Sequence, residues 1–349
     1  MRYPDYLRKD GTIGFIAPSF GCGEEDYRTV AFRNALRKWQ AMGYRIVPGP
    51  NCYASEGIGI SNTPEKCGQE VMDFYLSEET DCLISCGGGE LMCEILPYVD
   101  FAKLADAKPK WFMGYSDNTN LTHMLATWTD TASVYGPCAG TFGMEPWHES
   151  LRDAFGILTG EKVAEGKITV AGYEGWEAES LKGPENPLAP YNLTKERRIR
   201  TFLGRKPAAD AAFRGRLLGG CMDCLVNLLG TRFDKTAEFV KRYQGDGIIW
   251  FLEACDLNVF AIRRAMWQME EAGWLQHVKG FLFGRPMNGM PMMNLDACEA
   301  VLEVAGRKGV PVVMDVDLGH LPPMMPMIVG SLAEVTVEDN DIRIGMQCK

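Results

Sequence analysis

Residues 111–118 of this chain read WFMGYSDN, which predicts a strand that turns sharply into a helix at a serine. Apolar side chains precede the turn, and Leu121, Leu125 and Trp128 recur at helical spacing after Ser116. A glycine two positions before the serine permits a tight turn. The Ser116 hydroxyl would then lie at the positive end of the helix dipole, beside backbone N–H groups that can hold an oxyanion. Taken alone, however, the turn favours a plainer interpretation in which Ser116 is an ordinary helix N-cap.

Composition excludes several classes of protein. The 349 residues, 46% of them hydrophobic, are enough for a large core and predict two domains. The chain has 36 Lys+Arg against 46 Asp+Glu, a formal net charge of −10, and no basic block, so neither nucleic acid nor a membrane surface is expected as its main partner. The first residues lack the apolar segment of a signal peptide, and the apolar run Ile248–Leu252 is far too short to span a membrane. We therefore expect a cytoplasmic protein.

The sequence contains twelve cysteines, spread along its length. In a long chain without an export signal, buried and reduced thiols are expected rather than a disulfide framework. Cys221 and Cys224 form a C-x-x-C pair, but no second pair at structural-zinc spacing accompanies them. Cys86 precedes a run of three glycines, yet the apolar residues before it favour a packing role over a nucleophilic one. No metal site is therefore predicted.

The first half of the chain alternates short apolar strands with helices. The strands are expected over residues 12–17, 44–47, 81–85 and 111–113. Such alternation predicts an α/β fold with a mostly parallel sheet and helices on both of its faces. The active loops should lie beyond the carboxyl ends of the strands, where Ser19, the Gly87–Gly89 turn and Ser116 fall.

The middle of the chain differs in character from both ends. Residues 161–214 are rich in Gly, Pro, Glu and Lys with weak periodicity, which predicts a linker and a surface excursion. Strand and helix patterns then resume. We expect a nucleophile-bearing α/β domain over residues 1–160, the linker over 161–214, and a second α/β domain with substantial β-structure over 215–349.

Two residues in the second half are candidate partners for Ser116. Glu253 ends an apolar strand, although an acid there equally fits the start of the following helix. His320 lies in a loop after another apolar strand; a lone loop histidine is more often structural, but the chain has only four histidines and His320 is the best available base. A base that takes the hydroxyl proton and an acid that orients the imidazole make the order Ser, acid, His chemically sensible.

Several motifs, in the right order, resemble the serine LD-carboxypeptidase family, which includes muramoyl-tetrapeptide carboxypeptidases and the microcin C immunity peptidases. The similar segments are Gly88–Asp100 (GGELMCEILPYVD), Pro109–Thr119 (PKWFMGYSDNT), Tyr135–Pro137, Phe251–Glu253 with the following Arg263 and Arg264, and Gly319-His320 with Pro326. The likeness runs from Gly14 nearly to the carboxyl terminus, except between about Gly160 and Arg214.

The resemblance implies a Ser–Glu–His triad of Ser116, Glu253 and His320. It also implies an oxyanion hole made by the backbone N–H groups of Asp117 and of Gly88 or Gly89. The family fold has an N-terminal α/β nucleophile domain and a C-terminal domain with β-structure, commonly in a homodimer. A small peptide-like substrate is expected, and no metal or organic cofactor.

Departures from the family pattern bear on the substrate. Cys221 follows Gly219-Gly220 where the family often has asparagine, and Glu90-Leu91 follow Gly88-Gly89 where tetrapeptide carboxypeptidases usually have Tyr-Gly. The segment 95–100 is more similar to the microcin-immunity branch. A murein L,D-tetrapeptide and a microcin-like peptidyl-nucleotide are both candidate substrates, and Trp176 is a candidate platform for a nucleobase, although packing is its commoner role. The alternative is a non-catalytic protein that binds a small anion or a nucleotide through the glycine turn and helix N-termini.

Overall fold

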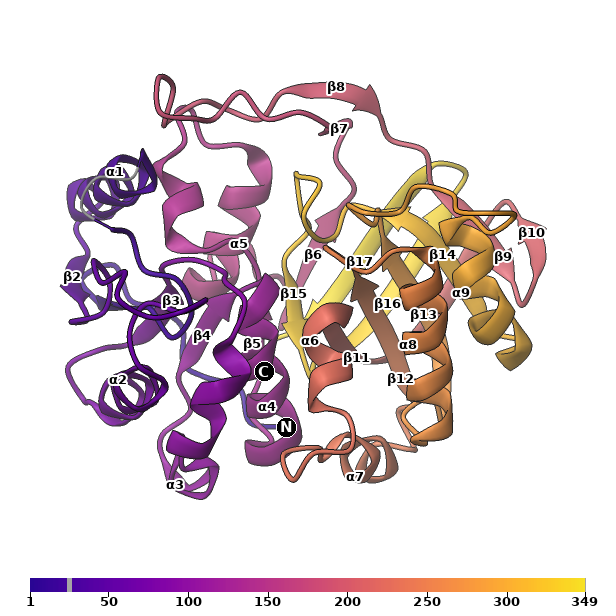
Figure 1. Ribbon diagram of the computed structural model, residues 1–349, viewed down its shortest axis with the longest axis horizontal. Coiled ribbons are helices and arrows are strands. Elements are labelled where there is room, and N and C mark those ends of the chain that lie inside the picture. Colours follow the sequence, from indigo (N-terminus) through magenta and orange to yellow (C-terminus); the bar gives the residue numbers. More distant parts are fainter. Residues whose placement is uncertain (24–26, 349) are drawn as a thin grey trace.

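The computed structural model describes residues 1–23 and 27–348 and places two β-sheets side by side (Figure 1). The first sheet has the strand order β15-β5-β4-β3-β1-β2, in which β2, β1, β3, β4 and β5 run parallel and β15 is antiparallel. Its strands are β1 Thr12–Ile16, β2 Arg45–Pro48, β3 Cys82–Ser85, β4 Trp111–Gly114, β5 Ser133–Tyr135 and β15 Met327–Val329.

Helices flank this sheet, as the strand–helix alternation predicts. The α-helices are α1 Tyr27–Ala41, α2 Pro64–Leu76, α3 Phe101–Asp106, α4 Thr119–Thr129 and α5 Glu149–Thr159, and the 3-10 turns are η1 Met92–Tyr98, η2 Ser116–Asn118 and η3 Ala139–Gly143. From β1 the chain adds β2 on one side of the sheet, and it then continues with β3, β4 and β5 on the other side. The switch point thus lies between β1 and β3, and a crevice at such a point is the usual ligand site of an open α/β sheet. The predicted mostly parallel sheet with flanking helices is confirmed.

The second sheet has the strand order β10-β9-β14-β13-β12-β11-β16-β17-β6. Its parallel centre is β11 Ala211–Cys221, β12 Ile248–Glu253, β13 Val278–Gly284 and β14 Pro311–Val316, and its antiparallel flanks are β6 Lys167–Ala171, β9 Arg200–Leu203, β10 Lys206–Ala208, β16 Leu332–Glu338 and β17 Asp341–Gln347. Its helices are α6 Met222–Leu228, α7 Thr236–Arg242, α8 Val259–Glu271 and α9 Ala297–Ala305, with a 3-10 turn η4 Gly306–Lys308. The predicted second, β-rich part of the fold is also confirmed.

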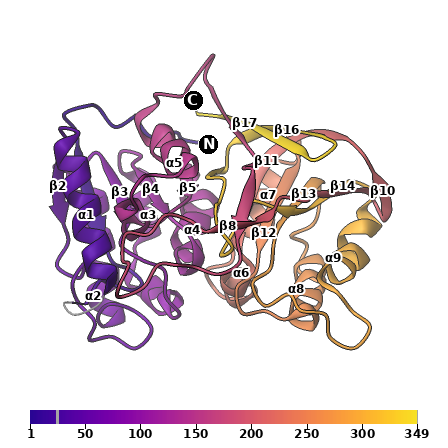
Figure 2. The same ribbon diagram turned by 90° about the horizontal axis from the view of Figure 1, so that it is seen from above.

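Segments distant in sequence join the two halves. Strand β15 leaves the second half and pairs with β5 of the first sheet, while β6, β9 and β10 from the region 161–214 extend the second sheet. Between β6 and β9 the chain forms a hairpin of β7 Gly175–Glu177 and β8 Leu193–Glu196, and it crosses from one half to the other in both views (Figures 1 and 2). The domain boundaries at residues 160 and 214 stay a prediction.

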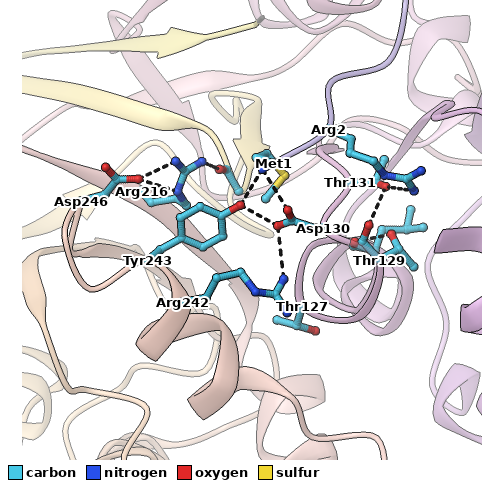
Figure 3. Close-up of polar contacts among 12 residues, drawn as sticks. Met1, Arg2, Thr127, Thr129, Asp130, Thr131, Arg216, Arg242, Tyr243 and Asp246 are labelled. Carbon is cyan, nitrogen blue, oxygen red and sulfur yellow. Dashed lines mark hydrogen bonds and ion pairs between the residues drawn. The ribbon is translucent and has the colours of Figure 1, made fainter. Parts of the chain in front are cut away.

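Polar contacts hold α4, the helix that follows Ser116, against the second half (Figure 3). Asp130 caps α4 in a left-handed conformation and accepts a 2.7 Å hydrogen bond from the Tyr243 hydroxyl. The Arg216 guanidinium lies 3.9 Å from the centre of the Tyr243 ring and donates to Asp246 at 3.0 Å. The apolar core is also continuous between the halves, since the rings of Tyr135 and Phe251 lie 5.6 Å apart. The nucleophile turn is thereby positioned relative to β11 and β12.

Candidate active site

Ser116 lies at the sharp turn between β4 and α4, in a left-handed conformation with φ 62°. A non-glycine residue seldom adopts this conformation, which costs on the order of 1–3 kcal/mol and is found mostly at functional turns. The space for the turn comes from Gly114, because a Cβ there would lie 2.8 Å from the Asn118 side chain. The N-cap of η2 is Tyr115, that of α4 is Asn118, and neither makes a side-chain capping bond. The N-cap interpretation of Ser116 is therefore wrong.

The Ser116 hydroxyl contacts His320 from the other half of the chain. Ser116 Oγ lies 2.8 Å from His320 Nε2, and His320 Nδ1 lies 2.8 Å from Glu253 Oε2. Glu253 ends β12 and is only 1% exposed, so its carboxylate faces the imidazole rather than capping the next helix. The structure thus brings together all three residues that the sequence suggested, from three separate elements.

Gly319 allows this close approach of His320 to Glu253. Its φ is +93°, and a Cβ at this position would lie 2.5 Å from Glu253 Oε2. Burial alone would lower the pKa of His320, but the adjacent Glu253 carboxylate and, after it, the Cys255 side chain outweigh burial and raise the pKa above its ordinary value. A carboxylate on Nδ1 also favours the tautomer with its proton on that nitrogen, which leaves Nε2 free to accept from the serine.

Tyr135 is a site residue to which sequence reasoning assigned no role. Its hydroxyl, at the end of β5, donates a 2.6 Å hydrogen bond to Glu253 Oε1 and accepts one of 3.2 Å from the Ser116 backbone N–H. Burial, and then the Glu253 charge, raise the pKa of Tyr135, so the phenol stays protonated and can donate. The only available signal was a tyrosine at the end of a buried strand that leads into the Gly136-Pro137 motif.

The residues suggested for an oxyanion hole lie around the same turn. A Cβ on Gly88 would lie 3.1 Å from Ser116 Cβ, whereas one on Gly89 would meet the Ser19 hydroxyl. Asp117 joins these loops, because its Oδ2 accepts from Ser19 Oγ at 2.6 Å and from the Met92 N–H at 2.9 Å. Burial raises the pKa of Asp117. Asn118 Nδ2 donates to the Gly87 carbonyl at 2.8 Å and so joins the nucleophile turn to the glycine turn. An oxyanion hole formed by the N–H groups of these turns stays a prediction.

Two cavities near the nucleophile turn share Tyr115, Thr141 and Lys182 in their linings. One, of about 230 Å³, is lined by residues that include His320, Glu177 and Lys182, and we call it the histidine-side cavity. The other, of about 260 Å³, is lined by residues that include Gly88 and again Lys182, and we call it the glycine-side cavity. Both cavities are thus bordered by the residue that precedes Ser116.

The Gly219–Cys221 segment at the end of β11 packs against Thr119, the first residue of α4. A Cβ on Gly220 would lie 2.7 Å from the Thr119 side chain, so glycine is required where β11 meets the start of α4. The Cys221 N–H donates to Thr119 Oγ1 at 3.0 Å, and the Cys224 thiol donates to the Ser116 carbonyl over 3.6 Å.

The cysteines of the described chain are all free thiols, and most are buried. Within residues 1–23 and 27–348, no cluster of three or more His, Cys, Asp or Glu side chains could hold a metal ion.

Trp176, the candidate nucleobase platform, lines neither of these cavities. It lies in a separate surface pocket, where the Arg285 guanidinium is 5.2 Å from the centre of its ring. A stacking role for Trp176 toward a ligand stays a prediction.

In the part of the chain that the structure describes, none of the helices is both long and apolar enough to cross a membrane.

Comparison with known proteins agrees with this architecture. Residues 13–136 match the family model of the LD-carboxypeptidase N-terminal domain, and residues 214–335 match that of the LD-carboxypeptidase C-terminal domain. The chain is 24% identical to the microcin C7 self-immunity protein MccF of Escherichia coli over 96% of its own length and 93% of that protein. It is also 24% identical to a probable murein peptide carboxypeptidase of Bacillus subtilis, over 96% and 92% of the respective chains.

A solved structure shares the fold. The structure of MccF in complex with glutamyl sulfamoyl guanosine superimposes with a TM-score of 0.78 and 21% sequence identity, over 98% of each chain. At this identity the likeness concerns the fold, and the chemistry has to be argued from the residues present.

Proposed function

Because this chain belongs to the LD-carboxypeptidase family and is a serine carboxypeptidase-like hydrolase, we propose that Ser116, His320 and Glu253 are its catalytic triad. The observation that carries the proposal is the unbroken chain of 2.8 Å contacts from Ser116 Oγ to His320 to Glu253. These residues come from positions 116, 253 and 320, so their meeting is not a consequence of local chain geometry.

The chemistry is acyl transfer. Ser116 Oγ attacks the scissile carbonyl carbon while its proton moves to His320 Nε2, and the carbonyl electron pair forms an oxyanion. In the proposal, the backbone N–H groups of Asp117 and of Gly88 or Gly89 stabilise that oxyanion. His320 then gives the proton to the leaving amine as the carbon–nitrogen bond breaks. A water attacks the acyl-serine by the same route in reverse, which releases the acid and restores the Ser116 hydroxyl.

Each positioning group has a defined part in this cycle. The Glu253 carboxylate stabilises the imidazolium that forms in both steps, and the raised pKa of His320 reflects that stabilisation. Tyr135 contacts both Glu253 and the Ser116 N–H, so it holds the acid and the nucleophile turn in one arrangement. The strained backbone of Ser116 presents its hydroxyl outward instead of along the helix.

The substrate that we propose is a small peptide-like molecule, either a murein L,D-tetrapeptide or a microcin-like peptidyl-nucleotide. The first is supported by the similarity to a murein peptide carboxypeptidase, and the second by the similarity to MccF, whose structures hold aminoacyl sulfamoyl nucleosides. The two cavities that Tyr115 borders, of about 230 and 260 Å³, have room for small groups of such a substrate. A homodimer, which the family resemblance implies, and a cytoplasmic location, which was expected from the sequence, are further parts of the proposal.

Incubation with each substrate tests the proposal. Wild-type protein and Ser116→Ala are mixed separately with an L,D-tetrapeptide and a hydrolysable peptidyl-adenylate analogue, and the products are identified by mass spectrometry. We expect release of the terminal residue or of the nucleotide part by the wild type only. Binding of either compound without turnover by the wild type would instead support a non-catalytic binding protein.

A further inference from the structure

Helix α6 contacts both the nucleophile turn and the residues that follow the proposed triad acid. It comes directly after β11 and lies between α4 and α8 (Figure 1). On one side, the Cys224 thiol donates to the Ser116 carbonyl over 3.6 Å. On the other side, the Asp223 carboxylate faces residues 255–257, which follow Glu253 and which we call the acid turn. One short helix thus joins the two parts of the site.

The Asp223 carboxylate accepts hydrogen bonds from three consecutive backbone N–H groups of the acid turn. Its Oδ2 accepts from Cys255 at 3.0 Å, and its Oδ1 accepts from Asp256 at 2.9 Å and from Leu257 at 3.1 Å. The Cys221 thiol donates a fourth bond to Oδ2 over 3.3 Å. Consecutive N–H groups that converge on one anion form a concave nest, and the charge of the acceptor strengthens each bond. Asp223 therefore fixes the backbone of the acid turn.

The register of the second sheet explains why this carboxylate meets this turn. Strands β11 and β12 are parallel, and Cys221 pairs with Glu253 at their ends. Two residues further along each segment, Asp223 and Cys255 therefore lie side by side. Helix α8 does not depend on the carboxylate for its own N-terminus, because the Asn258 side chain already caps it with a 3.0 Å hydrogen bond. The contacts of Asp223 thus serve the acid turn itself.

The acid turn contributes to the surroundings of the His320 imidazole. Its Nδ1 contacts Glu253 and its Nε2 contacts Ser116, while the Tyr115 ring centre lies 5.3 Å from the imidazole centre. Burial lowers the pKa of His320, whereas Glu253 and, after it, the Cys255 side chain raise this pKa. One of the two groups that raise it lies on the acid turn, and the other lies two residues before that turn.

We propose that Asp223 is a positioning residue, which holds the acid turn so that Glu253 and Cys255 stay in place beside His320. This inference rests on the proposed function, because it gives the turn a part in the triad. A misplacement of about 1 Å at a reacting group can cost roughly 10²-fold in rate. An acid that only stabilised the fold would leave the surroundings of the imidazole unchanged when it was replaced.

Asp223→Asn tests this role with little change of shape. The amide accepts on one atom only, and its NH₂ group offers a donor where an N–H group of the turn needs an acceptor. With the L,D-tetrapeptide or the peptidyl-adenylate analogue, whichever the wild type hydrolyses, we expect kcat on its alkaline plateau to fall by roughly 10- to 100-fold. KM should change little, and the acid limb should move to lower pH. Asp256→Asn removes an exposed acid of the same turn and, as the matched control, should behave as wild type.

Titration of His320 separates this inference from catalysis. The chain has four histidines, so the signal of His320 is identified by its absence from His320→Gln, and nuclear magnetic resonance follows its pKa. We expect a lower His320 pKa in Asp223→Asn than in the wild type, even if the wild type hydrolyses neither compound and the proposed function fails. Asp223→Ser, which keeps one uncharged acceptor, provides the same comparison if the asparagine variant does not fold. An unchanged His320 pKa in the folded variant, or an equal shift in Asp256→Asn, would overturn the inference.

Discussion

The Tyr135 hydroxyl donates a 2.6 Å hydrogen bond to Glu253 on the carboxylate oxygen that does not face His320. Each oxygen of this buried carboxylate therefore has its own partner, one neutral donor and one imidazole. Buried charges require such saturation, because an unmade hydrogen bond to a charged group costs on the order of 1–3 kcal/mol or more. The same tyrosine also accepts from the Ser116 N–H, so the acid and the nucleophile share one support.

Tyr135→Phe tests this support. Removal of the hydroxyl leaves Glu253 Oε1 and the Ser116 N–H without a partner, so we expect turnover to fall by roughly tenfold and stability by about 1–3 kcal/mol. Kinetics and urea unfolding measure the two effects. Tyr98→Phe, on an exposed tyrosine, is the control. Unchanged turnover in Tyr135→Phe would remove this residue from the positioning of the triad.

Ser116→Ala and Ser116→Gly form a pair that separates catalysis from strain. Both should lower turnover by roughly 10⁴-fold or more, as loss of a triad nucleophile does. Because φ at this position is 62°, glycine fits the backbone better than alanine, and we expect Ser116→Gly to unfold at a temperature at least as high as Ser116→Ala. Near-normal activity in either folded variant would contradict the mechanism.

The pH dependence follows from the raised pKa of His320. The imidazole accepts the serine proton only when neutral, so a pKa above the ordinary value of about 6.5 moves the acid limb of kcat/KM above that pH. Activity should therefore be lost as pH falls through this shifted limb. His320→Gln should be nearly inactive at every pH. A wild-type limb below pH 6.5, with chemistry rate-limiting, would argue against His320 as the base.

Glu253→Gln tests whether the Glu253 carboxylate shifts the acid limb of the kcat/KM profile. It removes the Glu253 charge, which raises the His320 pKa more than Cys255 does, so the acid limb should move to lower pH while turnover falls by roughly 10²- to 10⁴-fold. The shift of the limb distinguishes an orienting carboxylate from a merely structural one, because loss of a structural acid would leave the pH profile in place. Profiles of kcat/KM for both proteins over the same range provide the comparison.

Gly319→Ala tests the approach of the histidine loop. A Cβ would lie 2.5 Å from Glu253 Oε2, and φ is +93°, so we expect a stability loss of more than about 1 kcal/mol and a large loss of turnover. Gly245→Ala is the control, since a Cβ there meets nothing within 4 Å. If Gly319→Ala kept full activity, the loop would have to be more adaptable than its contacts indicate.

The local elements of this protein follow from its sequence. Apolar strands, helical spacing and the glycine before Ser116 are patterns within a few residues, and such patterns determine whether the chain extends or coils. For that reason the parallel sheet and the nucleophile turn could be expected. The order of serine, acid and histidine, together with the family resemblance, also pointed to Glu253 and His320.

Only the tertiary structure decided which distant residues meet. The pairing of β15 with β5, the return of β6 to the second sheet and the contact of Tyr135 with Glu253 join positions more than a hundred residues apart. The sequence around Lys182 is polar and irregular, and no periodicity could place that residue in the lining of the cavity that His320 also lines. Local patterns record the conformation of each segment, whereas the approach of segments depends on packing and hydrogen bonding summed over the whole chain, and that sum is available only in the folded molecule.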